Sequence, residues 1–329
     1  MPQVIVENLA KTYRIAKRRT GFLGALGGIA RREYHLVRAL TGVSFELEPG
    51  ELVGYIGPNG AGKSTTIKIL SGILVPDSGR CQILGKVPWR ERAAYVGQIG
   101  VVFGQRSQLW WDLPVVDSFD LLRDIYRVPP ARYGQSKDTL VQALGLAPLL
   151  DVPVRQLSLG QRMRCELAAS LLHAPRLLFL DEPTIGLDAV SKLAVRDFIR
   201  ELNRQRELTV ILTTHDMDDI EALCHRVMVI GRGSILFDGT LDRLRASVSP
   251  ERRLIIEVPP ELPLPELALP AARVVKREGE QVHISFDPRV VRPAQLIGEL
   301  SASLPLRDLY VVNPPIEEII AKLYGVFDL

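Results

Sequence analysis

The segment GPNGAGKS, at residues 57–64, constrains this chain more than any other feature of its sequence. It matches the pattern G-x-x-x-x-G-K-[ST] at every fixed position and stands between a short apolar run and an apolar-faced helical pattern. Glycines let consecutive backbone N–H groups turn toward an anion, and the next helix adds the positive end of its dipole. The order strand, loop, helix therefore predicts a phosphate-binding loop at one edge of a parallel sheet.

Two side chains of this loop carry the expected chemistry. Lys63 should reach the β- and γ-phosphates of a nucleotide, and the Ser64 hydroxyl should ligate Mg²⁺. The alternative is a glycine turn that matches the pattern by chance, and the strand–loop–helix context argues against it. The residues expected around the phosphates are Gly57, Pro58, Asn59, Gly60, Ala61, Gly62, Lys63, Ser64 and Thr65.

A second motif, RLLFLDEP at residues 176–183, is an apolar strand that ends in two acids. Such a strand delivers Asp181 to the carboxyl edge of the sheet, where it would hold Mg²⁺ through water. Glu182 would polarise the attacking water or accept its proton. An acidic pair after a strand is usually only a solvated strand end, but the phosphate-binding loop earlier in the chain favours the catalytic role.

The third motif is LSLGQ, at residues 157–161. Ser158 and Gln161 have the spacing of a capping box, so helix capping is the simplest interpretation. Capping does not explain Gly160, which stands in the first helical turn at a cost of up to ~1 kcal/mol relative to alanine. A helix N-terminus whose backbone approaches a phosphate closely does explain it.

With these three motifs the sequence resembles the ATP-binding cassette (ABC) ATPases. LSLGQ is similar to their LSGGQ signature, with Leu159 in place of the first glycine. The resemblance covers roughly residues 3–240. It implies binding of ATP and Mg²⁺ and hydrolysis of ATP to ADP and phosphate, and it is greatest to the ATPase subunits of bacterial drug- and ion-efflux systems.

The resemblance assigns roles to further residues. Gln105 resembles the catalytic glutamine that contacts Mg²⁺ and water; Gln108 is a rival for this role, and the spacing to the apolar residues that follow favours Gln105. Asp188 resembles the aspartate that crosses the dimer, and His215 resembles the switch histidine that contacts the γ-phosphate. Tyr13 resembles the aromatic residue that stacks on adenine, although an aromatic residue in a first strand more often packs in the core.

Alternating strand and helix patterns predict an α/β fold with a mainly parallel sheet covered by helices on both faces. The resemblance implies a P-loop NTPase core of the ABC type, with an antiparallel β subdomain and a helical subdomain at about residues 108–165. We expect this nucleotide-binding domain over residues 1–240 and a small C-terminal α/β domain over residues 241–329. Residues 81–103 are expected to hold short strands.

Composition excludes several classes of protein. With 41 basic and 38 acidic residues, the formal net charge is only +3, which argues against a protein that coats nucleic acid. Three scattered cysteines do not form a disulfide framework and fit a reducing cytosol. No stretch approaches the ~20 consecutive apolar residues of a membrane span.

The charge is nevertheless uneven, because a basic insertion occupies about residues 17–38, between the first two predicted strands. Residues 11–38 carry eight basic side chains and one acid. Two interpretations stay open: the insertion contacts an anionic cytoplasmic leaflet or a membrane subunit, or it is a solvated loop.

The resemblance also implies partners. Two copies of the chain would sandwich two ATP molecules and act on a separate integral-membrane permease, with no nucleic acid involved. The protein would then be cytoplasmic and peripheral to the inner face of the cell membrane, and most similar to exporters. A soluble ABC ATPase acting on ribosomes or DNA is the alternative. The spacing from Lys63 to Asp181 leaves no room for the coiled coils of repair members.

Overall fold

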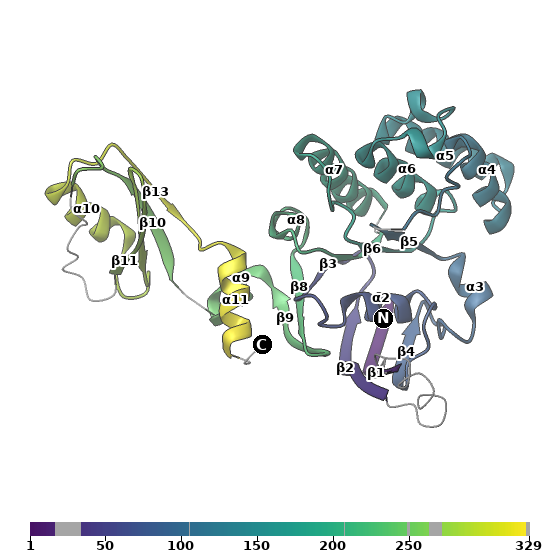
Figure 1. Cartoon of the computed structure of the whole chain (residues 1–329), viewed down its shortest axis with the longest axis horizontal. Coiled ribbons are helices and arrows are strands. Elements are labelled where there is room, and N and C mark those ends of the chain that lie inside the picture. Colours follow the sequence, from purple (N-terminus) through teal and green to yellow (C-terminus); the bar gives the residue numbers. More distant parts are fainter. Residues whose placement is uncertain (17–33, 105, 207, 249–250, 263–271, 327–329) are drawn as a thin grey trace, which may run out of the picture. The chain divides into compact units, whose positions relative to one another are not determined.

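The computed structural model describes residues 1–16, 34–104, 106–206, 208–248, 251–262 and 272–326 (Figure 1). Residues 17–33 of the basic insertion, and Gln105, lie outside this described part. The chain forms two compact units, Met1–Thr240 and Leu241–Leu329. Each unit is described by itself below.

The first unit is built on a six-stranded sheet with the order β5-β6-β7-β3-β8-β9. The first five of these strands are parallel, and β9 is antiparallel to β8. The near-continuous apolar runs of the inner strands are buried on both faces, as parallel strands require. This confirms the predicted α/β fold class. The strands are β3 (Leu52–Ile56), β5 (Ile99–Phe103), β6 (Leu177–Asp181), β7 (Thr209–Thr213), β8 (Arg226–Gly231) and β9 (Ser234–Thr240).

Helices cover both faces of this sheet (Figure 1). Helix α2 (Lys63–Leu70) lies on one side, whereas α6 (Leu159–Leu171), α7 (Ala189–Arg206) and α8 (Met217–Leu223) lie on the other. Helices α4 (Val115–Tyr126) and α5 (Pro130–Leu144) pack against α6 and form the helical end of the unit. Two short 3-10 helices, Ala147–Leu149 and Val154–Gln156, lead into α6.

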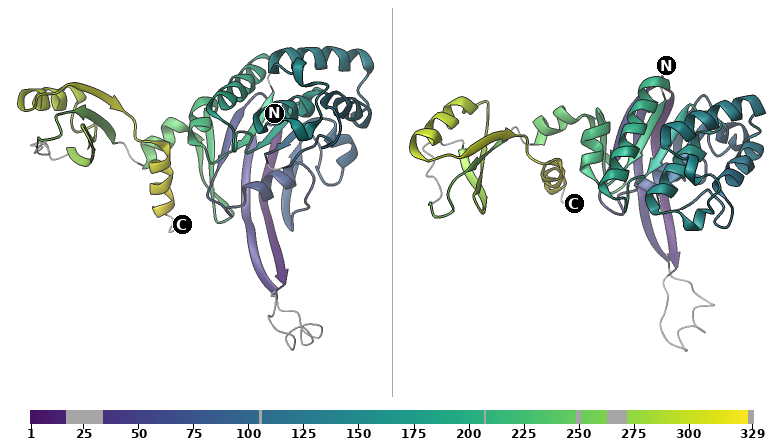
Figure 2. Two further views of the ribbon diagram at one scale, coloured as in Figure 1. Left: turned by 45° about the horizontal axis from the view of Figure 1, so that its top comes forward. Right: turned by 90° about the horizontal axis from the view of Figure 1, so that it is seen from above.

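A three-stranded antiparallel sheet of order β2-β1-β4 packs on the α2 side. It consists of β1 (Val4–Ala16), β2 (Tyr34–Leu47) and β4 (Ser78–Ile83). Strands β1 and β2 pair as far as Ala16 and Tyr34, but β4 pairs with β1 only as far as Ala10. The outer half of the pair is therefore a two-stranded ribbon that extends beyond the sheet (Figure 2).

Residues 81–103 contain the expected short strands, namely the end of β4 and all of β5, and in addition a short helix that was not expected, α3 (Arg92–Val96). Tyr95, on this helix, is fully buried, and its hydroxyl donates a hydrogen bond of 2.6 Å to the carbonyl of Leu70. A tertiary contact with α2 therefore decides the local structure.

The second unit has its own sheet, of order β11-β12-β10-β13, and its own core. Leu254, Ile284 and Phe286 on the sheet pack against Leu296 and Leu300 of α10. The elements are α9 (Leu241–Val248), β10 (Arg252–Glu257), β11 (Ala272–Glu278), β12 (Gln281–Phe286), α10 (Pro293–Ser303), β13 (Asp308–Val312) and α11 (Ile316–Val326). A separate core of this kind is what an independent domain requires.

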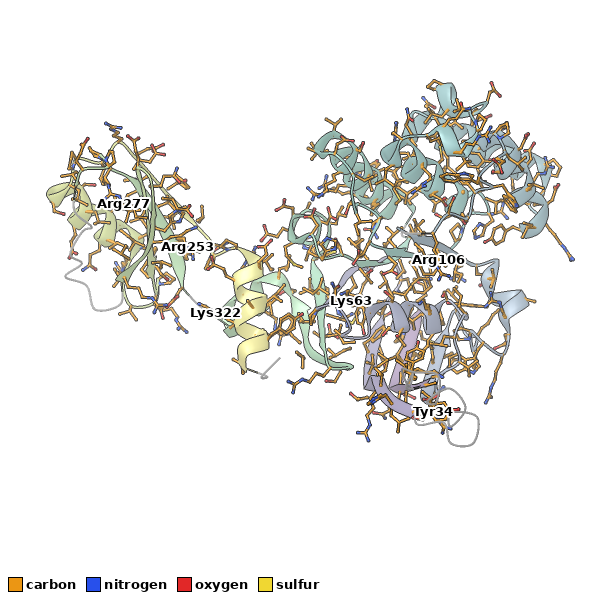
Figure 3. All side chains as sticks on the ribbon, viewed as in Figure 1. Tyr34, Lys63, Arg106, Arg253, Arg277 and Lys322 are labelled. Atoms are coloured by element: carbon orange, nitrogen blue, oxygen red, sulfur yellow. The ribbon has the colours of Figure 1, made fainter. Side chains whose placement is uncertain are left out.

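On the other face of that sheet, Arg253 pairs with Glu318 of α11 through two hydrogen bonds (Figure 3). Among the described residues of both units, no helix combines the length and the apolar character needed to cross a membrane.

Candidate functional site

A cavity of about 600 Å³ opens where the phosphate-binding loop meets the carboxyl ends of the central strands. It brings together side chains from three segments that the sequence motifs singled out, namely the loop after β3, the end of β6 and the end of β7. Its lining residues are Asn59, Ser64, Lys68, Ile73, Phe103, Gly104, Arg106, Asp181, Glu182, Ile185 and His215.

The phosphate-binding loop is held tightly against its neighbours. A Cβ atom on Gly57 would lie 2.5 Å from the carbonyl oxygen of Ile230, and one on Gly62 would lie 2.6 Å from that of Ala39. Gly62 also has a φ of +114°, which strains any other residue. These two glycines are therefore required by the fold, and a close approach of an anion to their backbone stays a prediction.

Lys63 is buried, and its ammonium lies inside its own loop (Figure 3). The Nζ atom donates hydrogen bonds to the carbonyls of Gly57, at 2.6 Å, and Pro58, at 3.2 Å. Burial lowers the pKa of Lys63 below its ordinary value, and the carboxylates of Glu182 and Asp181 oppose that shift. A cation desolvated in this way is stabilised when an anion binds in the loop.

Tyr13 approaches the same loop from β1. Its hydroxyl lies 3.4 Å from the hydroxyl of Thr65, at the start of α2. The ring is thus at the edge of the phosphate-binding segment, and its stacking on adenine stays a prediction.

The two acids at the end of β6 are held by β7. The hydroxyl of Thr213 donates a hydrogen bond to Oδ1 of Asp181, and the N–H of Glu182 donates to the carbonyl of Thr213 at 2.9 Å. Glu182 has a φ of +56°, in the left-handed region. Such a backbone costs a non-glycine residue roughly 1–3 kcal/mol and persists only where its surroundings enforce it, typically at functional sites.

Gly104 is part of what enforces this backbone. Its N–H donates to the carbonyl of Asp181 at 2.8 Å, and a Cβ atom on it would lie only 2.3 Å from the carbonyl oxygen of Glu182. The sequence motifs assign Gly104 no role, and the predicted Gln105 beside it lies outside the described residues. The side chain of the rival Gln108 donates to the carbonyl of Glu166 in α6 at 3.0 Å, away from the cavity.

His215 follows β7 and lies beside the acids. Its Nδ1 atom is 3.4 Å from Oε1 of Glu182. The imidazole is 61% exposed and the Glu182 side chain 22% exposed, so the pair faces the open side of the cavity. A carboxylate and an imidazole at this distance can share the handling of one proton or one phosphate oxygen.

The remaining predicted residues form a second group at the start of α6. The capping box is confirmed: Ser158 Oγ accepts a hydrogen bond from the N–H of Gln161, and the N–H of Ser158 donates to Gln161 Oε1. Asp188 accepts hydrogen bonds from the N–H and the hydroxyl of Ser191. None of these residues lines the cavity.

The structure gives Gly160 a reason that the sequence did not. A Cβ atom there would lie 2.4 Å from the hydroxyl oxygen of Ser191, the partner of Asp188. Close packing of α6 on α7 therefore requires this glycine, and an approach to phosphate stays a prediction.

Six lining residues were not anticipated: Lys68, Ile73, Phe103, Gly104, Arg106 and Ile185. Lys68 stands four residues after Ser64 in α2, so helical periodicity places the two on one face and is a usable signal. Arg106 directly follows the predicted glutamine (Figure 3). The two isoleucines read as ordinary core residues, and nothing in the sequence distinguishes them.

The donor set at the cavity fits a hydrated magnesium ion. The described residues contain no group of three or more His, Cys, Asp or Glu side chains that could hold a metal by themselves. The cavity does offer the Ser64 hydroxyl and the Asp181 carboxylate. Mg²⁺ takes few protein oxygens and completes its shell with water and phosphate oxygens, so this sparse set suits it.

Comparisons with known proteins agree on one family. Residues 40–185 match the family described as ABC transporter. The daunorubicin resistance ATP-binding protein DrrA3 of Streptomyces coeruleorubidus is 36% identical over 68% of this chain and 70% of its own length. The methionine import ATP-binding protein MetN of Geobacillus kaustophilus is also 36% identical, over 62% of this chain and 60% of its own length.

A solved structure shows the same fold. CbiO1 of Clostridium perfringens, described as part of the ABC transporter complex cbiONQ, superposes with a TM-score of 0.61 at 27% identity. The match covers 74% of this chain and 91% of that one.

Proposed function

Since the chain belongs to the ATP-binding proteins of ABC transporters and is an ATPase, we propose that it drives an exporter, as a homodimer on a separate membrane permease. One observation carries the hydrolytic part of the proposal. Ser64 of the phosphate-binding loop lines the same cavity as Asp181, Glu182 and His215.

Binding of ATP is the role of the loop. Its backbone N–H groups, the start of α2 and the ammonium of Lys63 would surround the β- and γ-phosphates. Ser64 and Asp181 would hold Mg²⁺, which when bound neutralises charge on the phosphate oxygens. Tyr13 would stack on the adenine ring, and Gln105 would contact the metal and the attacking water.

Hydrolysis is the role of the pair beside the loop. The water oxygen forms a bond to the γ-phosphorus while the bond from phosphorus to the ADP oxygen breaks, and Glu182 takes a proton from that water. His215, with Nδ1 at 3.4 Å from the Glu182 carboxylate, would hold a γ-phosphate oxygen in line. The left-handed backbone of Glu182 supports this assignment, because strain of this kind collects where a side chain must be aimed.

The second group of residues supports the homodimer. Ser158, Gly160, Gln161 and Asp188 are predicted to touch nucleotide, yet none of them lines the cavity of their own chain. A second copy that presents the start of its α6 to the cavity would supply them. Two such copies would enclose two ATP molecules, and loss of the γ-phosphate would release the contact.

Transport requires a surface for the permease. The helical end of the unit exposes Trp110, Trp111, Leu121 and Ile125, of which Trp111 is 53% exposed. Exposed aromatic and aliphatic side chains of this kind are typical of contact surfaces. The protein would then be cytoplasmic, held at the inner face of the cell membrane by the permease.

We propose export because this chain covers 70% of the length of the daunorubicin resistance protein DrrA3 but 60% of the length of the methionine import protein MetN.

Glu182→Gln tests the catalytic assignment. The amide keeps the shape of the carboxylate but cannot accept the proton, so kcat should fall by about 100-fold or more while ATP still binds. Size-exclusion chromatography with ATP should then show a stable dimer. Glu201→Gln is the matched control. This exposed acid accepts hydrogen bonds from Arg204 and Gln205 of α7, and its replacement should leave turnover unchanged.

Two results would contradict the proposal. Turnover at the wild-type rate in Glu182→Gln would remove Glu182 from the mechanism, and a protein that stays monomeric at saturating ATP would reject the homodimer. Purification from native membranes tests the partner: recovery with an integral-membrane protein supports transport, whereas recovery with ribosomes or DNA rejects it.

A further inference from the structure

A buried carboxylate connects the two catalytic segments of the first unit. Asp219, in the first turn of α8, has no exposed surface. Its Oδ2 atom accepts hydrogen bonds from the hydroxyls of Thr184 and Thr214, the second at 3.2 Å. Its Oδ1 atom accepts a hydrogen bond from Nε of Arg196 in α7, which also makes the contact an ion pair.

The two threonines stand next to the proposed catalytic groups. Thr184 comes two residues after Glu182, and Thr214 directly precedes His215. Both threonines are buried, with 2% and 1% of their surface exposed, so water cannot replace the carboxylate as their partner. One oxygen of Asp219 therefore ties the chain after Glu182 to the chain before His215.

The Asp219 carboxylate sets the direction of these hydrogen bonds, because a carboxylate only accepts. The neighbouring Asp216 holds the same network, since its backbone N–H donates to the hydroxyl oxygen of Thr214 at 3.0 Å. The Asp216 carboxylate in turn accepts hydrogen bonds from Lys192 and Arg196 of α7. The network thus holds the two catalytic segments against α7.

We propose that Asp219 is a positioning residue for ATP hydrolysis, because its carboxylate holds Thr184 and Thr214 and so sets the placement of Glu182 relative to His215. This inference rests on the proposed function, in which those two residues act on the γ-phosphate. Asp219 does not line the cavity and touches no reacting atom. Its effect should appear in the rate of the chemical step and not in the binding of ATP.

Asp219→Asn is the first test. Asparagine keeps the shape, but its amide has only one acceptor oxygen. It cannot accept from Thr184 and Thr214 on one side and from Arg196 on the other. We expect kcat to fall by about 10- to 100-fold, because a catalytic group that is misplaced by up to about 1 Å loses up to about 100-fold in rate. The KM for ATP should stay within about threefold, because Lys63 and Ser64 keep their own contacts.

Thr184→Val and Thr214→Val are the second test. They keep the Asp219–Arg196 ion pair and therefore allow the proposal to be tested even if Asp219→Asn does not fold. Each removes one hydroxyl from the network at nearly constant volume, and each should lower kcat by about 3- to 10-fold. Because these variants act through the same carboxylate, combining either with Asp219→Asn should give little further loss. In a Glu182→Gln background the residual rate should not change.

Asp238→Asn is the matched control. Asp238 also accepts two hydrogen bonds from an arginine of the same unit, Arg226, both at 2.8 Å, but it lies on β9 and outside the cavity lining. It should lower the melting temperature without changing kcat.

Wild-type kcat in both Asp219→Asn and Thr184→Val would overturn the positioning role. The positioning role would also be overturned if Asp238→Asn lowered the melting temperature and kcat by as much as Asp219→Asn does. Failure of the proposed function would look different, because Glu182→Gln would then turn over at the wild-type rate.

Discussion

Gly104→Ala is the most demanding test of the cavity, because one methyl group meets the backbone of the catalytic strand end. The new Cβ atom would lie 2.3 Å from the carbonyl oxygen of Glu182, 3.2 Å from that of Asp181 and 3.0 Å from Cγ2 of Ile185. Two of these neighbours are backbone carbonyl oxygens at the end of β6, so a side-chain rotation does not relieve the contact.

The size of the effect follows from that overlap. To restore even a 3.0 Å separation, the Glu182 carbonyl and Gly104 must move apart by about 0.7 Å. Glu182 already has a left-handed backbone, and its N–H is held by Thr213, so the displacement will change the direction of its side chain. Since a misplacement of about 1 Å costs about 100-fold in rate, we expect kcat to fall by roughly 10- to 100-fold.

Steady-state phosphate release measures this change, and differential scanning fluorimetry shows whether the variant is folded. Gly97→Ala is the matched control: Gly97 stands two residues before β5, has a right-handed helical backbone, and a Cβ there would meet no atom within 4 Å. It should turn over like the wild type. A folded Gly104→Ala enzyme with wild-type kcat would refute the link between this glycine and the placement of Glu182.

Two further predictions concern α6. Gly160→Ala should push α6 away from α7, because its Cβ would lie 2.4 Å from Ser191 Oγ. ATP-dependent dimerisation, measured by light scattering, should weaken by about tenfold, which corresponds to about 1.4 kcal/mol. An unchanged dimerisation affinity would contradict this. Burial raises the pKa of Glu166. Between the ordinary pKa and the raised one, the folded state keeps a proton that the unfolded chain releases. The free energy of unfolding therefore falls as the pH rises through this range. The stability advantage of the wild type over Glu166→Gln in urea unfolding should therefore shrink from mildly acidic to neutral pH, and a constant difference would contradict this.

The cavity could be predicted from the sequence because its motifs follow strands. Ser64, Asp181 and His215 are far apart in the chain, but each is placed by the carboxyl end of a parallel strand. Asp181 is the last residue of β6, His215 comes two residues after β7, and Ser64 lies in the first turn of α2, after the loop that follows β3. Those ends meet at one edge of the sheet, so the spacing of motif and strand is enough to bring the side chains together. Strand order was not needed for this inference.

Other features depend on packing that no pattern shows. Asp219 reads as one of two acids in the first turn of α8, where a negative charge suits the helix dipole. Only the fold turns this acid inward to Thr184 and Thr214. Gly104 likewise has no distinguishing signal in the sequence, and its necessity appears only when the strand end at Glu182 lies against it. Gly104 contacts backbone carbonyls at the end of β6, and Asp219 contacts buried hydroxyls after β6 and β7. These contacts form only when β5, β6 and β7 have come together.

Gly160 has two possible reasons, one from the sequence and one from the structure. The signature motif predicts that the missing side chain leaves room for a phosphate, whereas a Cβ atom there would meet Ser191. Ser191 also donates two hydrogen bonds to Asp188. Gly160 therefore lets the start of α6 and Asp188, which are both predicted to face the second subunit, pack against each other. The double variant Gly160→Ala with Ser191→Gly separates the two explanations. Dimerisation restored to the level of Ser191→Gly alone would mean that packing alone requires the glycine. Dimerisation weaker than in Ser191→Gly alone would mean that the nucleotide of the second subunit requires it as well.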